Sequence, residues 1–285
     1  MEDIRVLSKV PFDDVSGSSL RFAVRPVAGG GGPPLLAVDF EPLSQEPSLS
    51  SRLAERGSAR PIHGVDAVAD LIAAPAVVDL PAMALAYAHD VRRTVPGDRI
   101  TVVGFCSGAP LAAFISAELS ASYEVRTHLV QPTWPAEETV VREFMRFRRD
   151  MGVRDADPVR FDDLLGDPRG RYLAMADVLR ADLEAALGRM RVVNATVRAM
   201  YESLLSRYLA WLAFLTAGSA APLHQLHKLP ADALIRVAVA EEDALDVLPP
   251  GWTPPFEFDR YAVGSAELVT HIPFLDALLS WKGEA

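Results

Sequence analysis

A sharp turn between a strand and a helix is the feature of this sequence that most limits how the chain can fold. Residues 99–105, RITVVGF, form a short β-branched run that is typical of a buried parallel strand. Residues 109–119, APLAAFISAEL, form a helical pattern whose small residues allow close packing on a sheet. Cys106 lies between them, and Gly104 and Gly108 remove the side chains that would collide in a tight turn. We therefore expect a parallel sheet with helices packed against it.

This arrangement of Gly-x-Cys-x-Gly between an apolar strand and an apolar helix is the nucleophile elbow of α/β-hydrolases, with Cys106 as the nucleophile. Pro110 fits the first helical turn, where the amides have no intrahelical acceptor to lose. The helix dipole would stabilise a thiolate at this N-terminus. The alternative is a buried structural cysteine, which behaves as a small apolar residue.

The rest of the chain shows two kinds of sequence pattern, one typical of strands and one typical of helices. Strand patterns occur on both sides of the glycine and proline run within residues 21–40, in VRTHLVQP, which ends at Pro132, and after residue 232 in ALIRVAVAEED and FEFDRYAVGSAELV. Apolar residues at helical spacing predict one helix over residues 67–93. Residues 136–228 contain almost no strand pattern and instead show three amphipathic helical patterns.

These patterns predict an α/β chain with the α/β-hydrolase fold, in which helices flank a mostly parallel central sheet and a helical lid is inserted. Residues 1–135 would form the first part of the core, with the elbow. Residues 136–229 would form the lid. Residues 230–285 would complete the core with the acid and the histidine.

The catalytic base and acid follow from chain order, because α/β-hydrolases place them after the nucleophile in the order acid, then histidine. His271, in ELVTHIPFLDALL, lies between the last strand pattern and an apolar C-terminal helix, and we expect it to be the base. Asp243 in EEDALD follows the penultimate strand and is the expected acid, with Asp246 second. The other usual place for the acid, after the strand that follows the elbow, contains Gln131 and Thr133 instead of a carboxylate.

The remaining histidines fit structural roles better. His63 and His89 are expected in a loop and on a helix surface, and His128 is expected to pack within a strand. His224 and His227 are spaced like metal ligands, but no third ligand is near them in the sequence. No metal site and no cofactor are therefore expected.

Composition excludes several classes of partner. The net charge of -10 argues against nucleic acid, since nothing supplies a broad cationic face. A single cysteine permits no internal disulfide, and the first ten residues lack the apolar core of a secretory signal, so a cytoplasmic protein is expected. The apolar stretch at residues 208–217 is about half the length of a membrane span and is expected to be a buried helix.

The segment VPGDRITVVGFCSGAPLAAFISAEL, the helical insertion and THIPF together resemble the thioesterase branch of the α/β-hydrolases, the domains that off-load polyketides and nonribosomal peptides from carrier proteins. The resemblance covers nearly the whole chain. The cysteine, the length and the lid resemble the Dieckmann cyclases that form tetramic acid and pyridone rings with a Cys-Asp-His triad. Dienelactone hydrolases share Gly-x-Cys-x-Gly, but they lack a helical insertion of this size.

The resemblance implies an off-loading cyclase whose partner is an acyl or peptidyl carrier protein bearing a phosphopantetheine thioester, and whose substrate is the small-molecule acyl chain. His271, oriented by Asp243, would activate Cys106. The oxyanion would be held by the amide of Ser107 and by an amide of the loop after LLAVDF, at Phe40 or Glu41. A hydrolytic or macrocyclising thioesterase with the same triad and a non-catalytic binding protein are the alternatives.

Two features of the lid have both a functional and a structural interpretation. Five arginines form a local cationic cluster that either receives an acidic carrier protein or is a solvated helix face paired with Glu143 and Asp150. They are Arg142, Arg146, Arg148, Arg149 and Arg154. Six aromatic residues either line an acyl channel or pack in the lid core, and packing is the commoner role. They are Phe144, Phe147, Tyr201, Tyr208, Trp211 and Phe214.

Overall fold

The structure is a computed structural model that describes residues 22–40, 48–73, 75–153, 167–190, 194–229, 234–242 and 256–280. Within these ranges, one seven-stranded sheet has the strand order β1-β3-β2-β4-β5-β6-β7. The strands are β1 (Arg25–Ala28), β2 (Leu35–Val38), β3 (Ile62–Val65), β4 (Arg99–Phe105), β5 (Glu124–Val130), β6 (Leu234–Ala240) and β7 (Phe256–Tyr261). Neighbouring strands are parallel, except that β1 pairs antiparallel with β3. The carboxyl ends of β4 to β7 therefore meet at one edge of the sheet.

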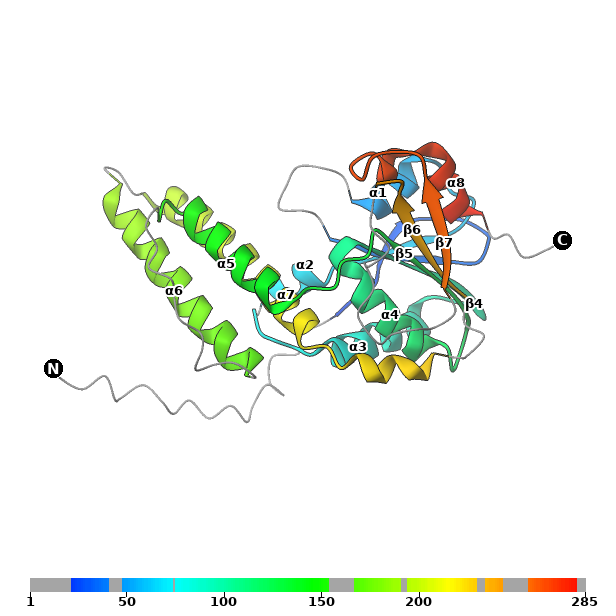
Figure 1. Cartoon of the computed structure of the whole chain (residues 1–285), viewed down its shortest axis with the longest axis horizontal. Coiled ribbons are helices and arrows are strands. Elements are labelled where there is room, and N and C mark those ends of the chain that lie inside the picture. The colour runs from blue at the N-terminus through cyan, green and yellow to red at the C-terminus, as the bar shows by residue number, and fades with distance from the viewer. Residues whose placement is uncertain are drawn as a thin grey trace.

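Helices cover both faces of this sheet (Figure 1). Alternating side chains of β2 explain why, since Leu36 and Val38 enter one apolar cluster and Leu35 and Ala37 enter another. The first cluster contains side chains of α3 (Leu80–Thr94) and α4 (Ala109–Leu119), and the second contains those of α1 (Leu49–Glu55) and α8 (Ile272–Leu279). Both faces of the parallel strands are thus buried, as their continuous apolar sequences predict.

Three long helices lie between β5 and β6 in the chain and extend away from the sheet (Figure 1). They are α5 (Glu137–Asp150), α6 (Pro168–Arg189) and α7 (Ala195–Ser219), and we call them the lid helices. They confirm the helical insertion. The three domain boundaries drawn from the sequence stay predictions.

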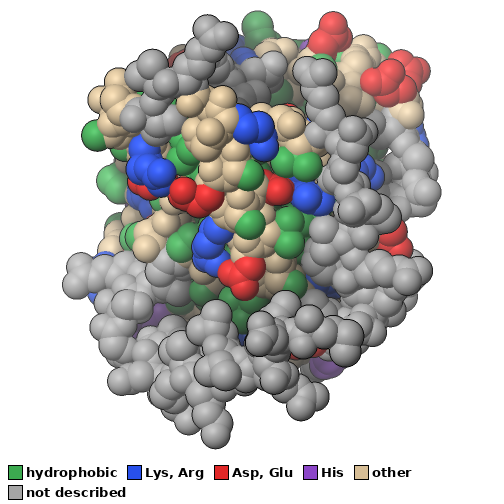
Figure 2. Space-filling model, turned by 90° about the vertical axis from the view of Figure 1, so that its left-hand side faces the viewer, with side chains coloured by type: hydrophobic (Ala, Val, Ile, Leu, Met, Phe, Trp, Pro, Cys, Tyr) green, Lys and Arg blue, Asp and Glu red, His purple; other side chains and the backbone are tan. Residues whose placement is uncertain are grey.

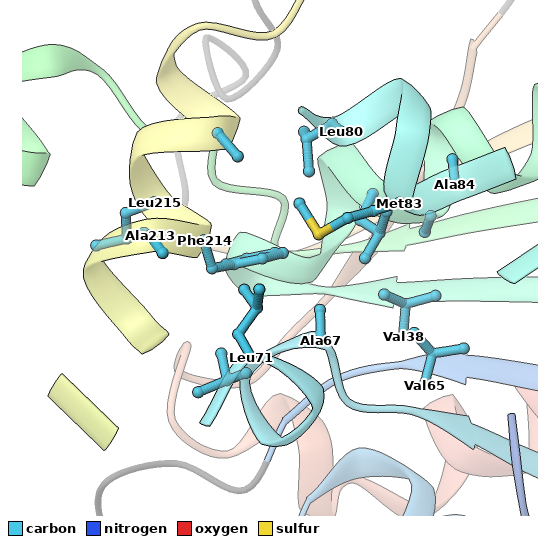
Figure 3. Close-up of a cluster of buried hydrophobic side chains, with 14 of the residues drawn as sticks. Val38, Val65, Ala67, Leu71, Leu80, Met83, Ala84, Ala213, Phe214 and Leu215 are labelled. Carbon is cyan, nitrogen blue, oxygen red and sulfur yellow. The ribbon is translucent and has the colours of Figure 1, made fainter. Parts of the chain in front are cut away.

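The C-terminal half of α7 joins the lid helices to the core. Phe214 of α7 is 1% exposed and points toward Leu71 of α2 (Ala67–Ile72) and Met83 of α3 (Figure 3). Both of those side chains are fully buried. The apolar stretch that was predicted to be a buried helix is therefore the part of α7 that anchors the lid helices to the sheet domain.

The single helix predicted over residues 67–93 is wrong, because the structure contains two helices, α2 and α3. Pro75 lies between them and cannot donate a helical hydrogen bond. Asp79 then caps α3, since its carboxylate accepts from the Ala82 amide at 2.7 Å. Apolar residues continue at helical spacing across this break, so the sequence pattern did not indicate it.

The last predicted strand is also shorter than its sequence pattern indicated. Strand β7 ends at Tyr261, and Leu268–Thr270 form a short 3-10 helix before α8. This early end leaves residues 262–271 as the loop that carries His271 at the carboxyl edge of the sheet. The two strands around the glycine run exist as predicted, and in the sheet β1 lies beside β3.

Candidate active site

Cys106 occupies the turn between β4 and α4, as predicted. Its φ of 50° lies in the left-handed region, which is rare for a residue with a side chain. A Cβ at Gly104 would lie 2.5 Å from Ala112 Cβ, and a Cβ at Gly108 would lie 2.4 Å from the Val38 carbonyl oxygen. Both distances are far shorter than a van der Waals contact. The absence of a side chain at the two glycines therefore allows the turn to pack against α4 and β2.

Two hydroxyl groups lie beside the Cys106 sulfur. Thr133 Oγ1 is 3.7 Å from Sγ, and Ser107 Oγ is 3.9 Å from it. The Thr133 amide also donates to the Cys106 carbonyl at 3.1 Å. Ser107 itself lies in the first turn after β4, where backbone amides have no intrahelical acceptor. Its role as a donor to an oxyanion stays a prediction.

His271 lies at the same edge of the sheet, at the N-terminus of α8. Its ring is half-buried and packs edge-on against Tyr261, with ring centroids 5.9 Å apart. Among the described residues, the hydrogen-bonding neighbours of the Cys106 sulfur are hydroxyl groups, and the His271 imidazole is not one of them. Catalytic hydrogen bonds are often long without substrate. The role of His271 as base stays a prediction.

Two polar side chains hold the loop that carries His271. Gln131, at the end of β5, donates from Nε2 to the Ser265 carbonyl at 2.9 Å. Glu242, just after β6, accepts from the Ser265 amide at 2.9 Å and from its hydroxyl at 3.1 Å. The loop is thus tied to the ends of two neighbouring strands. The sequence analysis did not predict either contact. The Glu242–Ser265 bond joins residues that are 23 positions apart and the Gln131–Ser265 bond joins residues that are 134 positions apart, and no local pattern marks such bonds.

Gln131 resembles Cys106 in its backbone, with a φ of 44°. The strained conformation persists because the Gln131 amide donates to the Ala238 carbonyl at 2.8 Å while the side chain bonds to the loop. The sequence position that lacks an acid is therefore occupied by a residue with a structural role.

The acid predicted from the sequence lies outside the described residues, and so does its alternative, Asp246. Asp243 directly follows Glu242, which is the last described residue after β6. Glu242 itself binds the loop that carries His271. The acid assignment stays a prediction.

Phe40 follows β2, which is the neighbour of β4 in the sheet. Its ring packs edge-on against Trp211 and Phe214 of α7, with centroid separations of 5.0 Å and 5.2 Å. The predicted oxyanion loop therefore begins where the lid helices contact the core. The other candidate donor, Glu41, lies outside the described residues.

A buried carboxyl group precedes this loop. Asp39 is 4% exposed and accepts hydrogen bonds from the Ser50 amide at 2.7 Å and from the Ser50 hydroxyl at 3.1 Å. These bonds hold the N-terminal turn of α1 against β2. Burial nevertheless raises the pKa of Asp39 from 3.8 to about 6, since the hydrogen bonds only partly offset the loss of water.

We expect Asp39→Asn to stabilise the fold at neutral pH. A raised pKa means that the folded state prefers the protonated acid, so the wild-type protein loses stability as pH rises from about 4 to about 6. Removing the charge avoids this loss, which is at most roughly 3 kcal/mol for about two pKa units. The free energy of unfolding, measured in urea at pH 4 and pH 7, should favour the variant at pH 7 alone.

Asp276→Asn is the matched control, because its pKa is lowered by hydrogen bonds from Arg56. The charged Asp276 carboxylate stabilises the fold at pH values above the pKa of this group in the unfolded chain, and this stabilisation is lost as pH falls. The two variants should therefore show opposite pH trends. An Asp39→Asn protein that is less stable than wild type at pH 7 would contradict the assignment.

The lid aromatics mostly pack in the lid core, as the structural interpretation predicted. Four of the six are buried, and Phe147 stacks on Tyr208 with ring centroids 3.9 Å apart. Tyr201 and Trp211 are half-buried. Trp211 is the member of the set that combines partial exposure with contact to the predicted oxyanion loop.

The arginine cluster is not a uniform cationic surface. Arg148 is 8% exposed and forms an ion pair with Asp182 at 2.7 Å, while Arg146 pairs with Glu143 at 2.8 Å. Figure 2 shows basic and acidic side chains interleaved around apolar ones on the face viewed from the lid end of the molecule. Arg154 lies outside the described residues. Arg148 therefore stabilises the lid helices rather than offering a site for a partner.

The remaining histidines occupy three kinds of position. The predicted loop position of His63 is wrong, because it lies in β3 and is half-buried, with a pKa lowered by burial. His128 lies in β5 as predicted, where burial and nearby arginines lower its pKa to about 3. His89 and His224 are exposed on helices, and the side chain of His227 is not described.

Two other kinds of feature are absent from the part of the chain that the structure describes. No three histidine, cysteine, aspartate or glutamate side chains there lie close enough together to hold a metal ion. None of the helices there combines the length and apolar character needed to cross a membrane.

Comparison with known proteins gives structural matches only. No protein-family model and no curated protein matches the sequence. A lipase-esterase related protein from Clostridium acetobutylicum matches with a TM-score of 0.51 and 11% identity, covering 90% of this chain and 97% of that one. Together with the mostly parallel sheet and the elbow, this match decides the fold class. The chain has the α/β-hydrolase fold.

Two further solved structures resemble this chain. A four-domain nonribosomal peptide synthetase, AB3403, matches with a TM-score of 0.54 and 15% identity over 90% of this chain. The chain spans only 20% of that larger protein. The NocB thioesterase domain matches with a TM-score of 0.49 and 16% identity, covering 90% of this chain and 96% of the domain. At these identities, structural likeness establishes the fold and not the reaction.

Proposed function

We propose that this α/β-hydrolase takes an acyl chain from a carrier protein onto Cys106 and releases it by intramolecular Dieckmann condensation, as a tetramate or pyridone. The observation that carries the proposal is the strained Cys106 in the turn after β4, with its sulfur at the carboxyl edge of the sheet. Strain of this kind at a cysteine between two required glycines supports a nucleophile rather than a packed thiol.

The first step is acyl transfer. His271, oriented by Asp243, takes the proton of the Cys106 thiol, and the thiolate attacks the carbonyl carbon of the carrier thioester. A new carbon–sulfur bond to Cys106 forms and the bond to the pantetheine sulfur breaks. The departing thiolate takes the proton from the imidazolium. One thioester replaces another, so this exchange is nearly balanced in free energy.

The second step closes the ring. His271 removes a proton from the acidic carbon between two carbonyls of the bound β-ketoamide, and this carbanion attacks the acyl carbonyl. The carbon–carbon bond forms, the carbon–sulfur bond breaks, and Cys106 returns to its thiol by taking back the proton. A thioester has less resonance stabilisation than an ester, which favours attack by a stabilised carbanion and gives a cyclising enzyme a use for sulfur.

Both steps pass through an oxyanion that needs hydrogen-bond donors. The Ser107 amide is one, and the amide of Phe40 is the proposed second, since Phe40 follows the strand beside β4. Loss of one such donor typically raises a barrier by about 3 kcal/mol.

The proposed partner is an acyl or peptidyl carrier protein bearing a phosphopantetheine thioester. The likeness to a four-domain nonribosomal peptide synthetase supports a partner of that kind. The second candidate is a hydrolytic or macrocyclising thioesterase. It would use the same residues, with water or an alcohol instead of the carbanion as the second nucleophile, and the likeness to a lipase-esterase related protein favours it.

Product analysis of a model substrate tests the proposal. We expect a β-ketoacyl-aminoacyl pantetheine thioester, incubated with the protein, to lose the thiol without gaining water, because the ring closes on the acyl carbonyl. Mass spectrometry in isotopically heavy water identifies the product. Free acid as the sole product would refute cyclisation.

A second substrate separates Dieckmann condensation from lactone formation, which has the same mass balance. In this substrate two methyl groups replace the acidic hydrogens, so no carbanion can form. We expect no cyclic product from it. A cyclic product would show that an oxygen nucleophile closes the ring and would favour the macrocyclising alternative.

A further inference from the structure

Thr133 is the polar residue most closely tied to the Cys106 sulfur. It lies in the loop after β5, and two contacts join it to Cys106. Its amide donates to the Cys106 carbonyl at 3.1 Å, and its hydroxyl lies 3.7 Å from the sulfur. The first contact holds the backbone of Thr133 against the strained Cys106. The Thr133 hydroxyl is therefore held close to the sulfur.

The ends of β5 and β6 stabilise this position. Two residues earlier, the backbone amide of Gln131 donates to the Ala238 carbonyl, and its side-chain Nε2 donates to the Ser265 carbonyl. These bonds fix the path of the chain from the end of β5 to Thr133. Thr133 is an exposed residue, whereas Ser107 is 7% exposed and its hydroxyl is 3.9 Å from the sulfur.

A hydroxyl at this place has a specific chemical use. A thiol is a weak acceptor, whereas a thiolate accepts charge-assisted hydrogen bonds, which are about twice as strong as neutral ones. A donor next to the sulfur therefore stabilises the thiolate more than the thiol or the thioester. Threonine has one rotatable hydroxyl and a restricted χ1, so little conformational entropy is lost when it donates.

We propose that Thr133 is a further catalytic residue of the cysteine site and donates a hydrogen bond to the Cys106 thiolate. This inference rests on the proposed function in which Cys106 is the nucleophile. The bond forms when the thiol loses its proton to the base, is released when sulfur bonds to the acyl carbon, and forms again when the carbon–sulfur bond breaks and sulfur leaves with the electron pair. The donor thereby favours formation of the thiolate and its departure from the acyl carbon.

Alkylation of the thiol tests this inference without any substrate. Cys106 is the only cysteine in the chain, so iodoacetamide reacts with one sulfur. We expect Thr133→Val, which keeps the shape and removes the donor, to slow alkylation at pH 7 by about threefold. Loss of a hydrogen bond to a charged group lowers the thiolate fraction by about tenfold, and the higher nucleophilicity of the remaining thiolate partly offsets this. Thr133→Ser restores the hydroxyl and should recover most of the rate.

Two controls make the result specific. Thr94→Val removes a hydroxyl at the end of α3, where Oγ1 donates to the Asp90 carbonyl, and should leave alkylation unchanged. Ser107→Ala removes the other neighbouring hydroxyl. A wild-type rate in Thr133→Val, or a larger loss in Ser107→Ala, would overturn the assignment.

The inference and the proposed function fail in different ways. If Thr133→Val slows alkylation but the wild-type protein does not release an acyl chain from the thioester, the thiolate donor stands and the proposed reaction falls. If turnover occurs and alkylation is independent of Thr133, the reaction stands and the donor assignment falls.

Discussion

Replacing Cys106 with alanine is expected to abolish release of the acyl chain from a carrier thioester. The variant cannot form the covalent acyl-enzyme, and loss of a nucleophile typically lowers kcat by roughly 10⁴-fold or more. The small side chain fits the same turn, so folding should be retained. Release of free pantetheine thiol measures turnover, and intact-protein mass measures the acyl-enzyme. Retained turnover would exclude a covalent mechanism through Cys106.

Cys106→Ser sharpens this prediction, because it keeps a nucleophile and replaces the thioester intermediate with an ester. An ester intermediate is less open to a carbanion than a thioester, so we expect the serine variant to release proportionally more free acid. The ratio of acid to cyclic product, measured by mass spectrometry, reports this directly. An unchanged ratio would mean that sulfur does not bias the second step.

Gly108→Ala is expected to produce the second largest effect, on folding rather than on chemistry. The new Cβ would lie 2.4 Å from the Val38 carbonyl oxygen and 3.2 Å from its carbonyl carbon. Backbone atoms of a central strand cannot move aside cheaply, so we expect a loss of about 3 kcal/mol or more in the free energy of unfolding. For a protein of this size that corresponds to a fall of roughly 6 to 12 °C in Tm.

Gly188→Ala is the matched control for that measurement. Gly188 lies in the last turns of α6, and a Cβ there has no neighbour within 4 Å. Alanine is a better helix former than glycine by about 1 kcal/mol, so this variant should be as stable as wild type or more stable. If calorimetry shows equal Tm values for Gly108→Ala and wild type, the close packing of the elbow on β2 is wrong.

Much of the fold was predictable because it depends on local patterns. The turn at Cys106 was predictable from two glycines flanking the cysteine between β-branched and small apolar residues, and the structure shows that each glycine is required by a close contact. The three amphipathic patterns within residues 136–228 predicted the lid helices, because a long amphipathic period is a local signal.

The fold was not predictable where two local signals competed or where the partner was distant. Apolar periodicity across residues 67–93 concealed a break that Pro75 and the capping Asp79 produce. The position of β1 beside β3 depends on sheet order, which no local pattern encodes. The ion-pair partner of Arg148, Asp182, lies 34 residues away on another helix, and no local pattern marks it.

By itself, the sequence determined the kind of chemistry that this protein offers: one cysteine in a strained turn, a histidine after the last strand, and a helical insertion between them. Tertiary structure alone decided which groups surround the sulfur and the histidine loop. The hydroxyl of Thr133 and the clamp of Gln131 and Glu242 on Ser265 join the ends of separate strands. Local patterns report the geometry of a few neighbouring residues, whereas these contacts exist only because parallel strands bring their carboxyl ends to one edge.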